Sequence, residues 1–182
     1  VHIIHRLDIG GLENGLVNLI NVIPPERYRH AIVCLSGFSP EFRSRIRRTD
    51  VQVSSVDKRP GKDPRAYLRV WRELRRLRPD VVHTRNIGTI DMQWIACAAR
   101  VHHRIHGEHG WDMQDPAGKR RRYRHVRRLY RPFVNRYIAL SHHLDAQLVG
   151  ADIDDVRVAP RDEAELAAGP LPELDAEAVA DV

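Results

Sequence analysis

The sequence has 182 residues, enough for one domain with a full hydrophobic core and too few for two ordinary domains. Its 42% hydrophobic and 30% charged residues are typical of a soluble globular chain, and no apolar run approaches the roughly 18 residues that span a bilayer. Two cysteines, Cys34 and Cys97, exclude a disulfide framework or a zinc-cysteine site, and we expect both to be buried in a reducing compartment.

The net charge of +6 is unevenly distributed. Residues 161–182 hold one base and seven acids, a net charge of −6, so residues 1–160 carry about +12 by subtraction. A basic body indicates an anionic partner, which could be a nucleic acid, an acidic lipid or a phosphorylated substrate. We expect one domain over residues 1–160, followed by an acidic, Ala- and Pro-rich tail over 161–182 that is poorly ordered.

Apolar β-branched runs alternate with helical patterns over the first 160 residues. In chain order, the pattern predicts a strand over Val1–Leu7, a helix over Leu12–Val22, a strand over His30–Leu35, a helix over Glu41–Arg47, a strand over Val51–Val56, a helix over Pro64–Leu77, a strand over Asp80–Thr84, a helix over Ile90–Ala99, a strand over Arg104–His106, a helix over Gly118–Val134, a strand over Tyr137–Leu140 and a helix capped by Ser141 that ends at Leu148. This alternation predicts an α/β fold with a Rossmann-like parallel sheet and helices on both faces.

Two of these helices have apolar stripes that should face the core. The predicted stripe of the first helix is Leu12, Leu16, Leu19 and Ile20. The predicted stripe of the helix over Pro64–Leu77 is Tyr67, Val70, Trp71, Leu74 and Leu77.

Paired glycines, Gly10 and Gly11, separate the first predicted strand from the first helix, and Asn14 follows them. Glycines let backbone N–H groups approach a ligand closely, and the N-terminus of a helix attracts phosphate. The spacing is not G-x-G-x-x-G, so a dinucleotide site is not predicted. A plain tight turn remains the alternative.

Ligands bind parallel sheets at the carboxyl ends of the strands, and four of the six predicted ends are rich in His, Arg, Asn, Asp or Gly. The segment His83-Thr84-Arg85-Asn86 closes the fourth predicted strand, although it could also be a turn that satisfies its own backbone.

The segment over residues 106–112, His-Gly-Glu-His-Gly-Trp-Asp, is the densest polar group in the chain. His106, Glu108 and His109 are metal-ligand types, but the glycines and the lack of an H-E-x-x-H pattern argue against a metal. A carbohydrate or phosphate pocket fits better, with Trp111 as a stacking surface for a sugar ring and His109 as a polar or proton-handling group.

Basic residues crowd the segment 119–131, where aromatic and aliphatic residues at helical spacing mark one face as core. The arginines on the other faces could be a solvated surface, or a contact with an anionic membrane, or a nucleic-acid site. No aromatic-interleaved platform and no helix-turn-helix pattern supports nucleic acid. The candidate membrane contacts are Lys119, Arg120, Arg121 and Arg122.

Three separated segments, VHIIHRLDIGGLENGLVNLIN, DVVHTRN and RIHGEHGWD, resemble in this order the N-terminal domain of family-4 glycosyltransferases. The resemblance covers residues 1 to about 158. Within this family, the sequence most resembles the sugar transferases that are associated with PEP-CTERM/exosortase exopolysaccharide clusters in bacteria. It implies the GT-B architecture, in which two Rossmann-like domains face a cleft, and this chain corresponds to the N-terminal, acceptor-side domain.

The resemblance implies retaining transfer of a sugar from a nucleotide-sugar donor to a glycan or lipid-linked acceptor, without a metal or other cofactor. It implies that Gly10 and Gly11 face the donor phosphates and the acceptor, and that His109 is the catalytic residue beside the anomeric carbon. Together with the motifs above, the candidate substrate-binding residues are Gly10, Gly11, Asn14, His83, Arg85, Asn86, Glu108, Trp111 and Asp112.

The resemblance also implies a second domain that binds most of the donor, and these 182 residues do not include it. Where the family usually runs into an Asn-Gly-Val-Asp linker, this sequence has Arg161-Asp162-Glu163. We therefore expect a fragment of a two-domain enzyme, cytoplasmic and peripheral at the inner membrane. The alternative is a truncated, non-catalytic domain that binds glycan or lipid phosphate.

Overall fold

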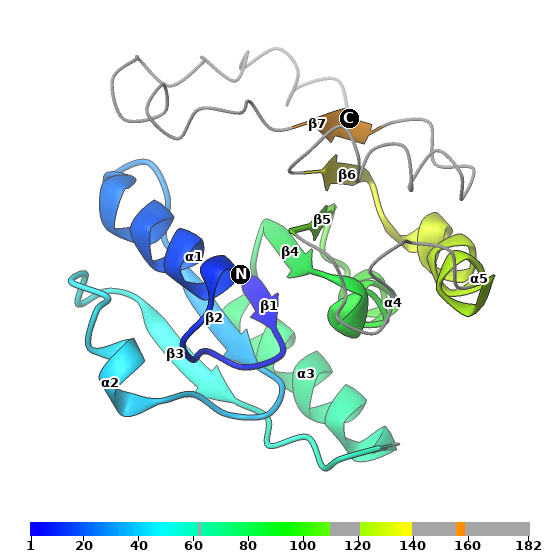
Figure 1. Cartoon of the computed structure of the whole chain (residues 1–182), viewed down its shortest axis with the longest axis horizontal. Coiled ribbons are helices and arrows are strands. Elements are labelled where there is room, and N and C mark those ends of the chain that lie inside the picture. Colours follow the sequence, from blue (N-terminus) through cyan, green and yellow to red (C-terminus); the bar gives the residue numbers. More distant parts are fainter. Residues whose placement is uncertain (62, 110–120, 140–155, 159–182) are drawn as a thin grey trace.

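The computed structural model describes residues 1–61, 63–109, 121–139 and 156–158, and these residues form one parallel sheet with flanking helices (Figure 1). The sheet order is β3-β2-β1-β4-β5-β6-β7, and every neighbouring pair is parallel. The strands are β1 (His2–Ile4), β2 (Ala31–Cys34), β3 (Gln52–Ser55), β4 (Val81–Arg85), β5 (His103–Glu108), β6 (Arg136–Ala139) and β7 (Val156–Val158). The predicted α/β, Rossmann-like fold class is confirmed.

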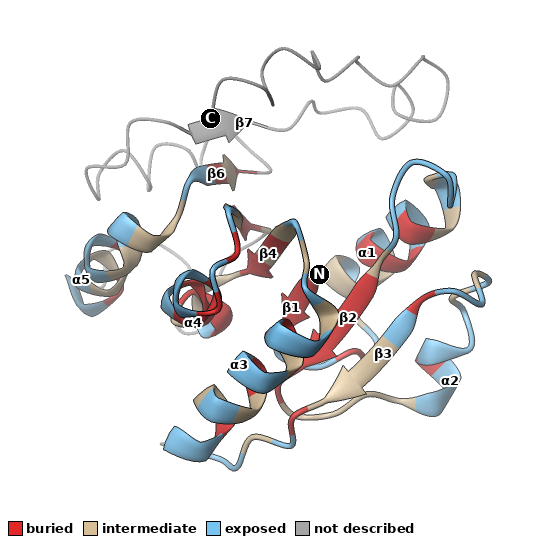
Figure 2. Ribbon diagram, turned by 180° about the vertical axis from the view of Figure 1, so that it is seen from behind, coloured by how far each residue is buried: buried red, intermediate tan, exposed pale blue. Residues whose placement is uncertain are grey.

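Helices cover both faces of the sheet, and Figure 2 shows the largely buried strands β1, β2 and β4 between them. The helices are α1 (Gly11–Val22), α2 (Pro40–Arg43), α3 (Pro64–Leu77), α4 (Met92–Ala98) and α5 (Arg121–Tyr130), with two 3₁₀ turns, η1 (Ile87–Thr89) and η2 (Arg131–Phe133). One apolar cluster joins α1 and α2 to the first face, and a second joins α3 and α4 to the opposite face. Residues of α5 pack with β6.

The predicted elements of the described residues are found, but some are shorter: the helix predicted over Glu41–Arg47 is observed over Pro40–Arg43, and the strand predicted over Val1–Leu7 over His2–Ile4. The helix over Pro64–Leu77 is observed with the predicted bounds. The segment predicted as one helix over Gly118–Val134 is divided within its described part into α5 and η2, because Pro132 has no N–H to continue the α-helical hydrogen bonds. β7 was not predicted. The predicted helix from Ser141 to Leu148 and the tail over 161–182 lie outside the described residues.

Three predicted burials are wrong. Leu19 and Trp71 are 42% and 37% exposed, and Cys97 is exposed, whereas Cys34 is buried as predicted. Since successive helical residues are rotated by about 100°, Trp71 points roughly 100° away from Val70, the centre of the buried stripe of α3. Trp71 therefore lies beside the buried stripe of α3 and remains partly exposed to solvent.

Candidate active site

The chain reverses its direction of growth across the sheet between β1 and β4, which lie side by side in spite of their distance in sequence. His2 pairs with His83 across these strands, and Arg85 of β4 pairs with Gly107 of β5. Such a switch point is where open α/β sheets bind ligands. The polar ends of β4 and β5 are therefore brought to one place beside the glycine turn that follows β1.

The glycine turn leads directly into α1, whose first residue is Gly11 and whose capping residue is Gly10. The carbonyl of Gly10 accepts the first helical hydrogen bond, from Asn14 N at 3.0 Å. A Cβ atom at Gly10 would collide with the carboxylate of Glu13, whereas Gly11 faces open space. The carboxylate of Glu13 thus lies close to the helix N-terminus, where a negative charge is favourable, and as the end of a flexible side chain it does not make glycine obligatory at position 10.

Asn86 joins the ends of β4 and β5. Its backbone N–H donates to the carbonyl of Gly107 at 2.8 Å, and its side-chain Oδ1 accepts from the backbone N–H of His109 at 2.7 Å. Its φ of 59° and ψ of 162° fall in a region that is essentially limited to glycine and costs about 1–3 kcal/mol. The two hydrogen bonds hold this strained residue in place, and through it the backbone of His109.

The side chains of His83 and His109 meet above Gly107. Their ring centroids are 5.9 Å apart, and the Nε2 atom of each is buried without a hydrogen-bond partner among the described residues. A Cβ atom at Gly107 would lie 2.5 Å from His109 Nε2 and 2.9 Å from His83 Nε2. Because Gly107 has no side chain, the two imidazoles can occupy the space directly beside its Cα atom.

Both imidazoles are held in the neutral form. Burial, followed by the positive charge of Arg85, lowers the pKa of His109 to about 4, and Glu108 opposes this only in part. Burial and then Arg85 also lower the pKa of His83 well below its ordinary value. At neutral pH, His109 is therefore an uncharged group that can donate and accept hydrogen bonds.

Arg85 is a buried cation, 4% exposed, that forms no ion pair among the described residues. Its Nη1 lies 2.9 Å from His2 Nδ1, and His2 Nε2 lies 3.1 Å from His30 Nδ1. Arginine can only donate, so His2 Nδ1 accepts and the proton of neutral His2 is on Nε2, from which it is donated to His30. Burial lowers the pKa of Arg85 to about 10, and Glu13 partly offsets this.

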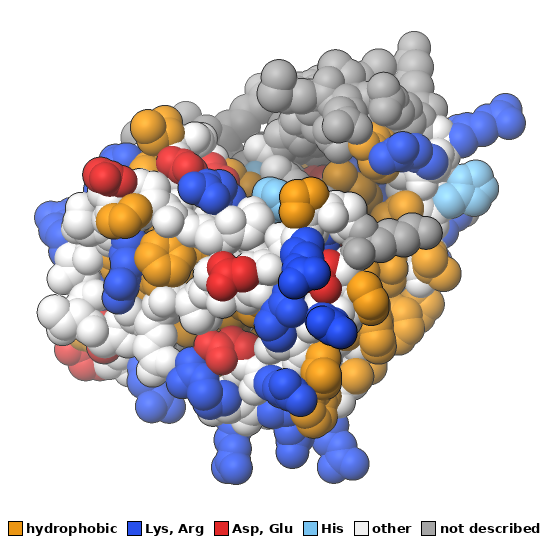
Figure 3. Space-filling view, turned by 90° about the horizontal axis from the view of Figure 1, so that it is seen from below, with side chains coloured by type: hydrophobic (Ala, Val, Ile, Leu, Met, Phe, Trp, Pro, Cys, Tyr) orange, Lys and Arg blue, Asp and Glu red, His pale blue; other side chains and the backbone are white. Residues whose placement is uncertain are grey.

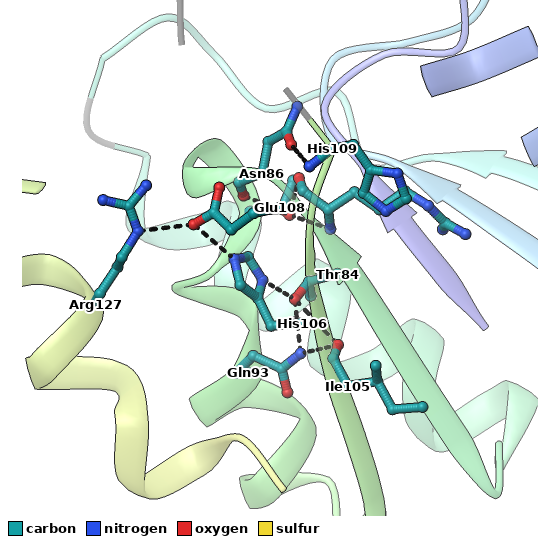
Figure 4. A network of polar contacts seen from close by, with 10 residues as sticks. Thr84, Asn86, Gln93, Ile105, His106, Glu108, His109 and Arg127 are labelled. Atoms are coloured by element: carbon teal, nitrogen blue, oxygen red, sulfur yellow. Dashed lines mark hydrogen bonds and ion pairs between the residues drawn. The ribbon is translucent and has the colours of Figure 1, made fainter. Parts of the chain in front are cut away.

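A second polar network lies on the opposite side of β5, and Figure 4 shows it between β5, α4 and α5. Glu108 accepts from Arg127 Nε at 2.8 Å and lies 3.5 Å from His106 Nε2. His106 Nδ1 is 2.8 Å from Thr84 Oγ1, which also accepts from Gln93. These side chains connect β4, β5, α4 and α5 inside the protein.

This network changes the interpretation of Glu108, which the sequence suggested as a substrate-binding residue. Glu108 is 3% exposed and its carboxylate is bonded to Arg127, so we assign it to holding β5 against α5. His106 and Glu108 point to one face of β5, whereas His109 meets His83 on the other face.

The remaining predicted site residues are placed as follows. Arg121 and Arg122 are exposed at the start of α5. Four predicted residues lie outside the described residues, namely Trp111, Asp112, Lys119 and Arg120.

Sequence reasoning missed three residues of this site: His2, His30 and Gly107. A glycine inside a strand is a signal of close approach by another group, and it could have indicated Gly107. Nothing in the sequence indicates that His2 and His30 form a chain with Arg85, since this depends on the pairing of β1 with β4.

Where the structure describes the chain, no three His, Cys, Asp or Glu side chains come together as a metal site requires. No helix among the described residues is both long enough and apolar enough to cross a bilayer.

Comparison with known proteins bears on what this site does. The model of Glycosyltransferase Family 4 matches residues 9–161, a segment that includes the glycine turn, Asn86 and His109. No curated protein has a significant match to the sequence. Because the family model covers most of the 182 residues, the chain belongs to Glycosyltransferase Family 4.

Proposed function

We propose that this domain is the acceptor side of a retaining glycosyltransferase that moves a sugar from a nucleotide-sugar donor to a glycan or lipid-linked acceptor. The family match supports sugar transfer in general. The finer assignment to bacterial exopolysaccharide synthesis rests on the resemblance of the three motifs to PEP-CTERM/exosortase-associated transferases. In this proposal a second domain binds most of the donor nucleotide, and no metal takes part.

The observation that carries the proposal is the placement of His109. Its backbone is held by Asn86, its ring lies over Gly107, and its buried Nε2 has no partner among the described residues. An unpartnered buried polar atom in a folded protein needs an explanation, and a bound substrate would supply the missing hydrogen bond. The position at a strand end, at the switch point of the sheet, is the expected place for that substrate.

The electrostatics of the site suit a sugar bonded to a diphosphate. Arg85, which has no ion pair among the described residues, and the N-terminus of α1 favour an anion on the α1 side of the sheet, and Glu13 offsets part of this positive potential. Retaining transfer passes through an oxocarbenium-like state, and a neutral imidazole stabilises such a state without the repulsion that an imidazolium would add. The lowered pKa of His109 keeps it in that neutral form.

The test is turnover of nucleotide-sugar donors by a polypeptide that joins this domain to its donor-binding domain. We expect His109→Ala to lower kcat by roughly 10²-fold, the scale of a positioned polar or acid–base group, with little loss of stability. His102→Ala is the matched control, because His102 is an exposed histidine that precedes β5. Near-normal turnover of His109→Ala would contradict the proposal.

His106, the buried histidine on β5, shows whether a loss of kcat comes from lost catalysis or from lost folding. His106→Ala removes the contact with Thr84 inside the protein, so we expect a lower melting temperature and a nearly unchanged kcat for the folded fraction. A larger loss of kcat in His106→Ala than in His109→Ala would show that the catalytic histidine is wrongly placed. Donor binding without turnover would favour the alternative of a non-catalytic glycan or lipid-phosphate-binding domain.

We also propose that α5 contacts an anionic membrane. Arg121, Arg122 and Leu129 are exposed on this helix, and Leu129 is 65% exposed. Figure 3 shows that Lys and Arg side chains predominate over acidic ones on the face viewed there. Basic residues near an anionic surface contribute about 1 kcal/mol each, and salt screens them.

Vesicle co-sedimentation checks the membrane proposal. Replacing Arg121 and Arg122 with Gln should weaken binding to phosphatidylglycerol vesicles by up to about thirtyfold and should not affect the weak binding to phosphatidylcholine. Replacing Arg72 and Arg75, exposed on α3, removes the same charge from another face and serves as the control. Equal losses from both pairs would show that only the net charge matters.

A further inference from the structure

A cavity of about 810 Å³ lies among α3, η1 and α5, on the face of the sheet opposite the ring of His109. Its volume is within the roughly 300–1,000 Å³ range of small-molecule sites. The side chains that matter for recognition are Lys58, Tyr67, Ile87, Asp91, Arg122 and Tyr130. None of them belongs to the site built around His109.

Asp91 gives this cavity an unfilled hydrogen-bonding position. Its Oδ2 accepts from the hydroxyl of Tyr67 at 2.9 Å, while its Oδ1 is buried and has no hydrogen-bond partner in the part of the chain that the structure describes. The side chain does not cap α4, which begins at the next residue. A buried acceptor without a donor costs about 1–3 kcal/mol, so Oδ1 is poised to accept from a bound molecule.

The charges around the cavity select a neutral ligand. A carboxylate at Asp91 repels an anion, and burial raises the pKa of this carboxyl group, although the hydrogen bond from Tyr67, the backbone at Asp91 and Met92 and the charge of Lys58 act in the opposite direction. Lys58 and Arg122 also line the cavity and repel a cation. A ring with several hydroxyl groups satisfies both, because hydroxyls donate to Asp91 and accept from the two cations.

The remaining lining is aromatic and aliphatic. Tyr67 and Tyr130 are half-buried at the cavity, and Ile87 adds an apolar surface. Aromatic rings combined with a carboxylate acceptor suit a sugar, whose C–H faces pack on rings while its hydroxyls bond at the edge. Phosphate alone would gain nothing from the aromatic surface.

The cavity adjoins the candidate active site through one short segment of chain. Asn86 bonds to the backbone of His109, and the next residue, Ile87, lines the cavity. Asn86 and Ile87 are adjacent in the chain, so the segment that holds the backbone of His109 also forms part of the cavity wall.

We propose that this cavity is a sugar-binding subsite, in which a neutral ring of the acceptor glycan donates a hydroxyl hydrogen bond to Asp91 Oδ1 and packs against Tyr67 and Tyr130. This inference rests on the proposed function for its acceptor, but the binding of sugar itself does not depend on transfer.

Binding is tested on the 182-residue chain with methyl glucoside, methyl galactoside, methyl mannoside and N-acetylglucosamine as probes. The expected result is saturable binding of at least one sugar with a Kd of roughly 1–10 mM, and Asp91→Asn should weaken it about tenfold. Asp80→Asn, an exposed residue before β4, is the control. No saturable binding up to about 50 mM, or equal affinity in Asp91→Asn, would overturn the proposal.

A measurement on the unmodified chain guards against misfolding of the variant. Nuclear Overhauser contacts between the bound sugar and ¹³C-labelled tyrosine rings should involve Tyr67 and Tyr130. They should not involve Tyr28, an exposed residue on the connection between α1 and β2 that does not line the cavity. Contacts to Tyr28 alone would overturn the assignment of the site. Tighter binding of inorganic phosphate than of every neutral sugar would overturn the ligand class.

Kinetic measurements of sugar transfer distinguish a failure of the subsite from a failure of the proposed function. In the two-domain polypeptide, Asp91→Asn should raise the acceptor KM about tenfold and leave the donor KM unchanged. Transfer with an unchanged acceptor KM would refute the subsite alone. Sugar binding at Asp91 without any transfer would refute the proposed function alone.

Discussion

At the scale of single residues, the site depends on what Gly107 lacks. The Nε2 atoms of His83 and His109 both occupy positions that a Cβ atom at residue 107 would invade. Asn86 itself has a backbone conformation that residues other than glycine rarely adopt, and its side chain holds the backbone of His109. The orientation of the imidazoles is therefore set by one absent side chain and one strained residue.

We expect Gly107→Ala to lower the free energy of unfolding by about 1–3 kcal/mol, because the added methyl group overpacks the space held by the two rings. Adding His83→Ala to Gly107→Ala should restore part of this loss, since it removes one of the colliding rings, and a double-mutant cycle in urea measures the coupling. Gly15→Ala, inside α1 with open space around it, is the control and should stabilise by up to about 1 kcal/mol. Additive effects of the two substitutions would contradict the collision.

At the scale of elements, the sequence predicts the order of helices and strands well, and it predicts poorly which residues the buried polar side chains contact. Helical periodicity and the placement of Pro64 in the first turn locate α3 with its observed bounds, although Trp71 of the predicted stripe is partly exposed. The alternation of strands and helices similarly predicts the sheet. Hydropathy gives no reason to bury Arg85, and the pairing of β1 with β4 that places it beside His2 is a long-range event.

The role of Glu108 shows the same limit for the candidate site. Its position in a motif suggested a ligand contact, but only the packing of α5 on β6 brings Arg127 to within 2.8 Å of its carboxylate. Local sequence thus indicated the strand ends at which function is proposed, and it could not separate the side chains of one motif into the two faces of β5.

The Glu108–Arg127 pair gives a test of stability. Glu108→Gln should cost about 3–5 kcal/mol at pH 7, because it leaves Arg127 buried without its counter-charge. Glu73→Gln, which breaks a pair with an Arg76 side chain that is 55% exposed, is the control and should cost at most about 1 kcal/mol. Urea unfolding measures both, and equal small losses would contradict the structural role of Glu108.

The pH dependence of this difference has a definite sign. Burial alone would raise the pKa of Glu108, but His106 and Arg127 outweigh it and hold the pKa at about 2, below the ordinary 4.5. A carboxyl group with a lowered pKa contributes its stability above pH 4.5 and loses it as the pH falls towards 2. The deficit of Glu108→Gln should therefore be constant from pH 7 to about 5 and shrink below 4.5.

At the scale of the whole molecule, histidines with lowered pKa values are concentrated on the side of the sheet where the candidate site lies. Burial is the first cause for each of them, and Arg85 adds positive charge near each of them. The four are His2, His30, His83 and His109. These four uncharged imidazoles surround Arg85, which forms no ion pair with any described residue.

This arrangement predicts a loss of stability in mild acid, before any carboxylate of the Glu108 pair is protonated. A histidine whose folded pKa is near 4 takes up its proton on unfolding at any pH between about 4 and its ordinary 6.5, so the free energy of unfolding falls as the pH falls through that window. Each such histidine adds up to about 1.4 kcal/mol per pH unit to the slope. Because the pKa of His83 is lowered well below its ordinary value, His83→Asn should reduce this slope just below pH 6.5 by up to one proton, as measured by urea unfolding at several pH values. A slope that His83→Asn leaves unchanged, or a His83 imidazole that titrates near pH 6.5 by NMR in the folded chain, would contradict the neutral histidine cluster.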